Sequence, residues 1–185
     1  MAAPTPGSPG EVLQFWFLEL APGQWWAVDP TLDAHISQRF AALLQSAAAA
    51  ELQAWRATAT GRLAEVIVLD QFSRNIYRNT PLAFARDGMA LVLAQEGVRS
   101  GALDALPPAQ RAFLLMPYMH SESAAIHPEA VVLFERFTPP ESHDFELRHK
   151  AIIDRFGRYP HRNAILGRRS TAEELTFLAQ PGSRF

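Results

Sequence analysis

LAEVIVLDQFSRNIYR, the stretch from Leu63 to Arg78, decides the fold. Its first seven residues are apolar on nearly every side, which is typical of a buried element. The run Val66–Leu69 alone would suit a buried strand. The pattern continues helically, however, because Asp70 and Arg74 are four residues apart and lie on one helix face. We therefore predict a buried helix from about Leu63 to Arg74.

Start and stop signals for further helices stand on both sides of this stretch. Two segments have capping-box spacing, Ser8–Glu11 and Thr171–Glu174, and Gly157 stands where a helix C-cap glycine is expected. No segment shows sustained period-2 alternation. We predict an all-α chain of about eight or nine helices in antiparallel pairs, as in an α-solenoid or an irregular bundle. The expected helices cover about 11–20, 30–43, 47–55, 63–74, 81–99, 128–137 and 143–156, with two more opening at 107 and 172.

Length and composition favour one globular domain. The chain has 185 residues, 48% hydrophobic and 19% charged, with a net charge of −2 and no cysteine. We expect a flexible lead-in over 1–10, a helical domain over 11–180 and a tail over 181–185. The N-terminus has no basic or apolar stretch of a secretory signal, and no apolar run is long enough to span a bilayer. These features predict a cytoplasmic protein with neither nucleic acid nor membrane as a partner.

Polar residues that are unusual for a buried helix occur first in the segment 69–78. Asp70 can pair with Arg74, and Gln71 with Asn75, because each pair is four residues apart. Arg78 follows one turn later. Two interpretations stay open. The residues form a buried ion-pair network that anchors neighbouring helices, or they form a pocket wall whose guanidinium groups bind carboxylate or phosphate.

A second polar segment follows a proline within a helical pattern. Pro117 removes one backbone hydrogen bond, so we expect a kinked helix. His120 and Glu122 come directly after it. They converge only if the helix ends there. His120 is then a candidate general acid or base that Glu122 or Asp70 orients, while the alternative is an ordinary polar last turn.

The third segment, 145–174, is the richest in cationic groups. His149 shares a face with Ile152, Ile153 and other apolar residues, so we predict that it is buried. A Pro-bearing turn then carries a histidine, three other polar side chains and a following arginine: Arg158, His161, Arg162, Asn163 and Arg168. Residues 143–169 have a net charge of +4 with three histidines besides. This segment and the capped helix start beyond it predict an anion site.

Metal and cofactor sites find little support. Glu146 and His149 have the spacing of one half of a di-iron site, but the second half is missing. The other histidines, with Glu122, lack a zinc-protease spacing. No phosphate-binding glycine loop, dinucleotide fingerprint or serine nucleophile elbow occurs. We therefore predict neither a metal nor a cofactor.

Three blocks of sequence resemble those of a bacterial family, the domain of unknown function 924. They are LDQFSRNIYRNTPLAFARD, MPYMHSE and RHKAIIDRFGRYPHRNAILGRRSTAEELTFL. The resemblance covers roughly residues 11–180 and implies a tetratricopeptide-like helical superhelix. It implies as motif residues Asp70, Gln71, Arg74, Asn75, Arg78, His120, Glu122, His149, Arg158, Pro160, His161, Arg162, Asn163, Gly167, Arg168 and Thr171. Ser123 departs from the pattern, which has an acid there, and so does His127-Pro128, where a glutamine is expected.

Two functions remain open at this point. The first is a binding module whose groove, rich in arginine and histidine, takes a peptide, a partner protein or an anionic ligand. The second is an enzyme that acts on a small anionic substrate by general acid–base chemistry. In the second case His120 or His161 transfers the proton, and Arg74, Arg158 and Arg162 hold the anion. We expect the segments 69–78, 117–122 and 158–168 to meet in space, because buried charges need partners.

Overall fold

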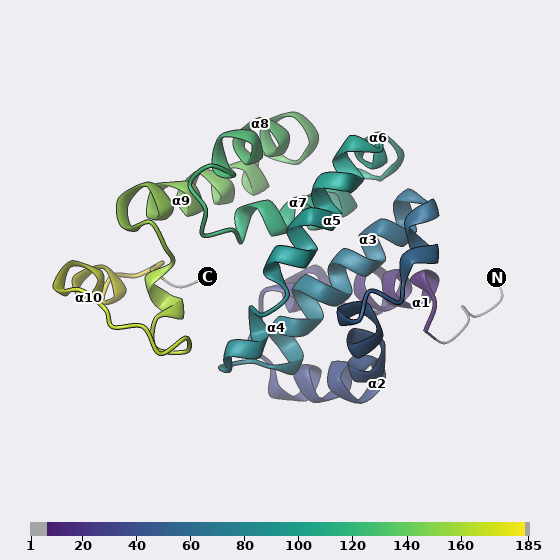
Figure 1. The fold of residues 1–185 in the computed structure, drawn as a ribbon, viewed down its shortest axis with the longest axis horizontal. Coiled ribbons are helices and arrows are strands. Elements are labelled where there is room, and N and C mark those ends of the chain that lie inside the picture. The colour runs from purple at the N-terminus through teal and green to yellow at the C-terminus, as the bar shows by residue number, and fades with distance from the viewer. Residues whose placement is uncertain (1–6, 184–185) are drawn as a thin grey trace.

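The computed structural model describes residues 7–183, and helices make up its framework (Figure 1). No strand occurs in this part of the chain, and eight of its α-helices are longer than four residues, so the expected all-α class with eight or nine helices is confirmed. The helices are α1 Pro9–Gln14, α2 Pro30–Ala48, α3 Ala59–Ile67, α4 Ser73–Ile76, α5 Asp87–Arg99, α6 Ala102–Ala105, α7 Pro108–Met119, α8 His127–Phe137, α9 Pro140–Phe156 and α10 Ala172–Leu178.

Helix α3 forms the centre of the main core, as its apolar sequence predicts. It packs against α1, α5 and α7, and the side chains of Val66–Leu69 are completely buried. The strand alternative for these residues is excluded, because a π-helical turn, Val68–Phe72, joins α3 to α4. Buried aromatic side chains complete the core: Phe72 stacks on Phe40 with ring centroids 4.7 Å apart.

Two expected helices have different bounds in the structure. The alanine-rich stretch 47–55 is not a separate helix. Helix α2 continues to Ala48, the chain reverses at Ala50 with φ of 60°, and a 3₁₀ turn follows at Gln53–Ala57. The helix expected over 81–99 begins only at Asp87, because Pro81–Ala83 forms a 3₁₀ turn. The positive φ at Ala50 belongs to a local C-cap turn in which Glu51 N donates to the Ser46 carbonyl at 3.0 Å, and helix propensity alone does not indicate such a turn.

Helix α1 begins within the segment 1–10. The Ser8 hydroxyl accepts a hydrogen bond from Glu11 N, so α1 already begins at Pro9. Residues 1–6 of the expected lead-in and 184–185 of the expected tail lie outside the described residues.

The C-terminal elements lie on the opposite side of the molecule from α1 and α2 (Figure 1). Helix α8 packs against α7 and α9, and a 3₁₀ turn at Pro160–Arg162 packs against α10. A second small core forms here around Ile152, Ile153 and Tyr159. Within residues 7–183, no helix combines the length and apolar character that crossing a bilayer requires.

Candidate functional site

The π-helical turn Val68–Phe72 places polar side chains inside the molecule. Asp70 and Gln71 are both buried, and the Asp70 side chain is only 1% exposed. Gln71 Nε2 donates to Asp70 Oδ2 at 2.6 Å and to the Met116 sulfur. Single π-turns within α-helices are frequent at functional sites. The π-helical turn is therefore a structural sign of a functional site in this segment. The sequence pattern did not predict the turn.

His120 is held by Asp70. Helix α7 continues through Pro117 to Met119, so His120 stands at its C-terminal end. The His120 Nδ1 and Asp70 Oδ1 atoms are 2.8 Å apart. Burial, together with the nearby Arg74 charge, lowers the pKa of His120. Burial disfavours ionisation of Asp70, but the Arg74 charge and the hydrogen bond with His120 outweigh it and hold the Asp70 pKa below its usual range.

These pKa shifts define the protonation state of the pair. Ionised Asp70 accepts a hydrogen bond from Nδ1–H of neutral His120, so the lone pair of the imidazole is on Nε2. Nε2 forms no hydrogen bond with another residue in the part of the chain described. The geometry thus leaves one oriented basic nitrogen available to a ligand.

Asp87 is the central acceptor of the site, and the sequence analysis did not identify it. Both Asp87 oxygens accept from Arg74, at 2.9 and 3.0 Å, and Oδ2 also accepts from Arg162 Nη1 at 3.0 Å. Arg74 bonds Asp70 as well, as its i,i+4 spacing predicts. The Arg162 guanidinium lies 4.5 Å above the Phe84 ring and donates to the His120 carbonyl. Asp87 and Phe84 lie at the end of the first family-like sequence block, which was the available signal for them.

We call Asp70, Arg74, Asp87, His120 and Arg162 the inner cluster. An outer cluster lies beside it and consists of Glu122, Arg158, Asn163, Arg168 and Glu174. Arg168 donates two hydrogen bonds to Glu122, at 2.7 and 2.9 Å, and Glu122 also accepts from Tyr159 N. Although burial disfavours ionisation of Glu122, its bonds with Arg168 and Tyr159 N lower its pKa.

The other half of the outer cluster anchors α10. Arg158 donates to both oxygens of Glu174, at 2.7 and 2.8 Å, and lowers the pKa of Glu174 to about 2. Asn163 Nδ2 also donates to Glu174, while Asn163 Oδ1 accepts from Arg168. Thr171 and Glu174 form the predicted capping box. The arginines of the expected anion site are thus each bonded to a carboxylate in this structure.

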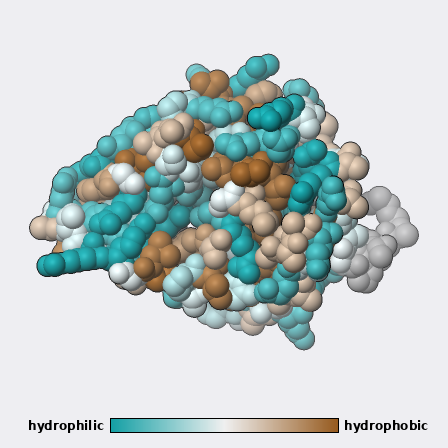
Figure 2. Space-filling view, in the orientation of Figure 1, coloured by the Kyte–Doolittle hydropathy of each residue, from teal (hydrophilic) through white to brown (hydrophobic). Residues whose placement is uncertain are grey.

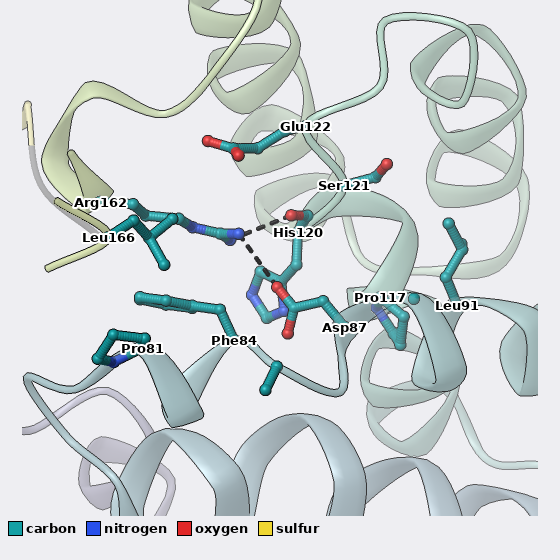
Figure 3. A pocket seen from close by; sticks show the side chains of 12 residues that line it. Pro81, Phe84, Asp87, Leu91, Pro117, His120, Ser121, Glu122, Arg162 and Leu166 are labelled. Carbon is teal, nitrogen blue, oxygen red and sulfur yellow. Dashed lines mark hydrogen bonds and ion pairs between the residues drawn. The ribbon is translucent and has the colours of Figure 1, made fainter. Parts of the chain in front are cut away.

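A pocket of about 300 Å³ opens beside the inner cluster (Figure 3). Its polar lining comes from Asp87, His120, Ser121, Glu122 and Arg162, and its apolar lining includes Phe84, Leu91, Pro117 and Leu166. In Figure 3 the Arg162 guanidinium lies between Phe84 and Glu122, and the Ser121 side chain points away from the imidazole. The volume is at the lower end of the range for small-molecule sites.

The structure brings the three polar segments together, with individual exceptions. Arg162 bonds the His120 carbonyl, and Arg168 bonds Glu122. Arg78, however, pairs with Asp33 outside both clusters. The expected pair of Gln71 and Asn75 is wrong: Asn75 donates to Asp33, because the π-helical turn rotates Gln71 toward Asp70 and Met116.

His149 and His161 of the third segment belong to neither cluster and do not line the pocket. His149 is buried as predicted, and its Nδ1 donates to the Phe145 carbonyl at 2.8 Å. Phe145 itself is 48% exposed, so it does not share the buried face of His149. His161 stacks on Tyr159 with ring centroids 5.7 Å apart. Burial lowers the pKa of His149 to about 3 and that of His161 to about 4.

One position that departs from the family-like pattern, His127, forms a buried support for the loop that follows His120. His127 bonds Glu146 through Nδ1 at 2.7 Å and donates from Nε2 to the Ser121 carbonyl at 2.9 Å. Both side chains of this pair are fully buried. The Ser123 amide donates to the Ser121 hydroxyl. Within residues 7–183, no group of three or more His, Asp or Glu side chains is placed to hold a metal ion.

Comparisons with known proteins give matches that include the residues of the inner and outer clusters. Residues 12–182 match the model of a family described as bacterial protein of unknown function, DUF924. The structure of the protein of unknown function ATU0120 from Agrobacterium tumefaciens is similar, with a TM-score of 0.88 and 34% sequence identity; the match covers 92% of this chain and 96% of that one. No curated protein gives a significant match. The chain thus belongs to the DUF924 family of bacterial proteins.

Proposed function

We propose that the pocket beside the inner cluster binds a small molecule and that His120 acts on it as a general base. The observation that carries this proposal is the pair of His120 and Asp70, which are 2.8 Å apart with Asp70 buried and the histidine at the pocket wall. A carboxylate that binds Nδ1–H fixes the ring and its tautomer, so Nε2 can take a proton from a bound group.

The size of the pocket supports a small ligand more than a peptide or a partner protein. A volume of about 300 Å³ accommodates a small molecule that consists of one functional group and a few further heavy atoms. On the face drawn in Figure 2, the brown hydrophobic residues form separate patches among teal hydrophilic ones. A stable protein partner would be expected to use a larger continuous surface. The groove for a peptide stays a prediction from the sequence.

The arrangement supports proton transfer more than nucleophilic catalysis by a serine. Ser121 is the hydroxyl of the pocket lining, but its side chain points away from the His120 ring (Figure 3) and accepts a hydrogen bond from Ser123 N. His120 would therefore activate either a group of the ligand itself or a water molecule. Asp70 serves as a positioning residue, because it acts through the histidine.

A simple activated ester tests this proposal. 4-Nitrophenyl acetate is neutral and small, and release of 4-nitrophenolate reports a reactive imidazole directly. We expect the rate above solvent background to fall by roughly 10²-fold in His120→Gln, a typical contribution of a general base. The rate should already be independent of pH above about pH 7, because the His120 pKa lies below its ordinary value of about 6.5.

The matched control is His35→Gln, which removes an exposed histidine from α2. Its rate should equal that of the unmodified chain. Asp70→Asn should lower the rate and alter its pH profile, since an amide can favour the wrong imidazole tautomer. Equal rates for His120→Gln and the unmodified chain would refute the proposal, provided that circular dichroism shows both to be folded.

A further inference from the structure

The charges around the pocket balance without any ligand. In the inner cluster, Arg74 and Arg162 face Asp70 and Asp87, and all four bonds are 3.0 Å or shorter. Next to it, Glu122 is matched by Arg168, as described above. With His120 neutral, the sum of these formal charges is zero. The local positive charge that the sequence showed over 143–169 is therefore already balanced by carboxylates from other segments.

From this balance we infer that the pocket selects a neutral molecule that carries a hydroxyl group next to a small apolar body. This inference rests on the proposed function, because it names the ligand class of the same pocket. It differs from the anionic ligand that the arginine-rich sequence favours. Its basis is the set of unused hydrogen-bond acceptors that line the cavity.

The polar wall of the pocket offers mainly acceptors. His120 Nε2 has a lone pair, and the carboxylates of Asp87 and Glu122 have fewer bonds than their oxygens can accept. The one unbonded donor near this wall, Arg162 Nε, is buried and therefore does not face the cavity. A hydroxyl group can donate a hydrogen bond to these acceptors. A carboxylate only accepts.

An ionic ligand would disturb the charge balance. A carboxylate would lie near Asp87 and Glu122 while the neighbouring guanidinium groups are already bonded. Placing a charge in a partly buried site without a free counterion is costly. His120 could restore neutrality by taking up a proton, but burial and Arg74 oppose that. An ammonium group would meet the opposite difficulty, since Arg162 lines the same cavity.

The apolar wall defines the rest of the ligand. Phe84, Leu91, Pro117 and Leu166 also line the cavity, and the Asp87 carboxylate lies between Phe84 and Pro117 in Figure 3. They suit a short branched hydrocarbon portion, whose burial adds to affinity in proportion to its area. A polar, fully hydroxylated molecule would leave these residues without apolar contact.

A matched set of three molecules tests the inference. 3-Methylbutan-1-ol, 3-methylbutanoate and 3-methylbutylammonium have the same hydrocarbon portion and differ only in their head groups. Each is titrated at pH 8 into the ¹³C-labelled chain, and the His120 Cε1–H resonance is followed by NMR. The His120→Gln variant assigns that resonance. We expect the alcohol to shift the His120 resonance saturably, with at least about tenfold higher affinity than either ion. The difference reflects the free-energy penalty that each ion pays for a buried polar group without a partner.

The pH dependence of the carboxylate titration strengthens the test. Charged or titratable groups around His120 are Asp70, Arg74, Asp87, Glu122, His149, His161 and Arg162. Any binding of 3-methylbutanoate should improve as the pH falls and should raise the His120 pKa, because neutrality then requires proton uptake. In Arg78→Ala, which breaks the pair with Asp33 outside both clusters, the alcohol affinity should be unchanged.

Each contrary result has a distinct meaning. Tighter binding of the carboxylate at pH 8, without a rise in the His120 pKa, would overturn the inference and indicate an anion site. Tighter binding of the amine would overturn it in favour of a cation site. If none of the three shifts the resonance, the inference fails while the proposed function is judged separately by the ester reaction of His120.

Discussion

The inner and outer clusters use the same residue types but differ in what they leave unused. In the outer cluster, Glu122 and Glu174 each bind an arginine through both oxygens, and each also accepts from a backbone amide. In the inner cluster, Nε2 of His120 and Nε of Arg162 have no such partner in the described part of the chain. The outer cluster thus mainly fixes the loop 158–171 and α10, although Glu122 also lines the pocket, whereas the inner cluster retains the lone pair of His120 Nε2 for a ligand.

Burial separates Asp70 of the inner cluster from the Glu122–Arg168 pair of the outer cluster. The Asp70 side chain is 1% exposed, while Glu122 and Arg168 are each 26% exposed. Water can replace a lost partner of Glu122 but not one of Asp70. Equal truncations should therefore have unequal effects on the free energy of unfolding.

The largest loss of stability is expected for Arg74→Ala. This change removes the partner that Asp70 and Asp87 share and leaves two carboxylates close together within the core. Breaking a buried ion pair costs about 3–5 kcal/mol. Urea denaturation followed by circular dichroism measures the change, with the exposed Arg99→Ala as a control. A loss below about 1 kcal/mol would show that water reaches the inner cluster. The two clusters would then not differ in how much a lost ion pair destabilises the fold.

A pH effect comes next in size, and it concerns the two histidines beside Tyr159. The pKa values of His149 and His161 are lowered to about 3 and about 4, below the value of about 6.5 in an unfolded chain. The unfolded chain therefore binds protons first. The stability that these groups contribute is complete above about pH 6.5 and is lost as the pH falls, toward pH 4 for His161 and toward pH 3 for His149.

The slope of that loss can be measured for one histidine. Between pH 6 and 4.5, each group should contribute up to about 1.4 kcal/mol for every pH unit. His149→Gln should lower the slope of unfolding free energy against pH by about this amount, whatever its effect on stability at pH 8. Unchanged slopes in the two proteins would mean that His149 is protonated in the folded chain.

Local spacing predicted part of this site and tertiary contacts determined the rest. The i,i+4 pair of Asp70 and Arg74 follows from helix geometry. Asp87 was missed because its two arginine partners, Arg74 and Arg162, lie 13 and 75 residues away along the chain. The π-helical turn that carries Gln71 shifts the register by one residue, which no apolar periodicity reveals.

The charge of the pocket, too, could not be predicted from local sequence. Counting residues over 143–169 indicates a positive segment, and the residues do include the expected arginines. The segment count omits Glu122, Asp87 and Glu174, which come from three other elements and bind those arginines. Net charge over a stretch of sequence therefore says little about the field in a pocket where distant segments meet.

A smaller loss is expected for Arg168→Ala in the outer cluster. The change removes two bonds to Glu122, one to Asn163 and one to the Tyr159 carbonyl, but water can reach the carboxylate that remains. We expect about 1–2 kcal/mol from urea denaturation. A loss as large as that of Arg74→Ala would show that the two clusters form one cooperative network. A double-mutant cycle with Glu122→Gln then measures their coupling.

The smallest effect is expected for Thr171→Ala, at the far end of the outer cluster. Thr171 Oγ1 accepts from Glu174 N at 3.1 Å, and an N-cap of this kind contributes about 1 kcal/mol. The other half of the capping box should persist, because Arg158 continues to hold the Glu174 carboxylate that accepts from Thr171 N. Thr171→Ser keeps the hydroxyl and should restore the melting temperature. Neither variant should change the ester reaction of His120, since the outer cluster fixes α10 rather than the basic nitrogen. If Thr171→Ala slowed that reaction in the folded protein, the start of α10 would have to be counted as part of the site.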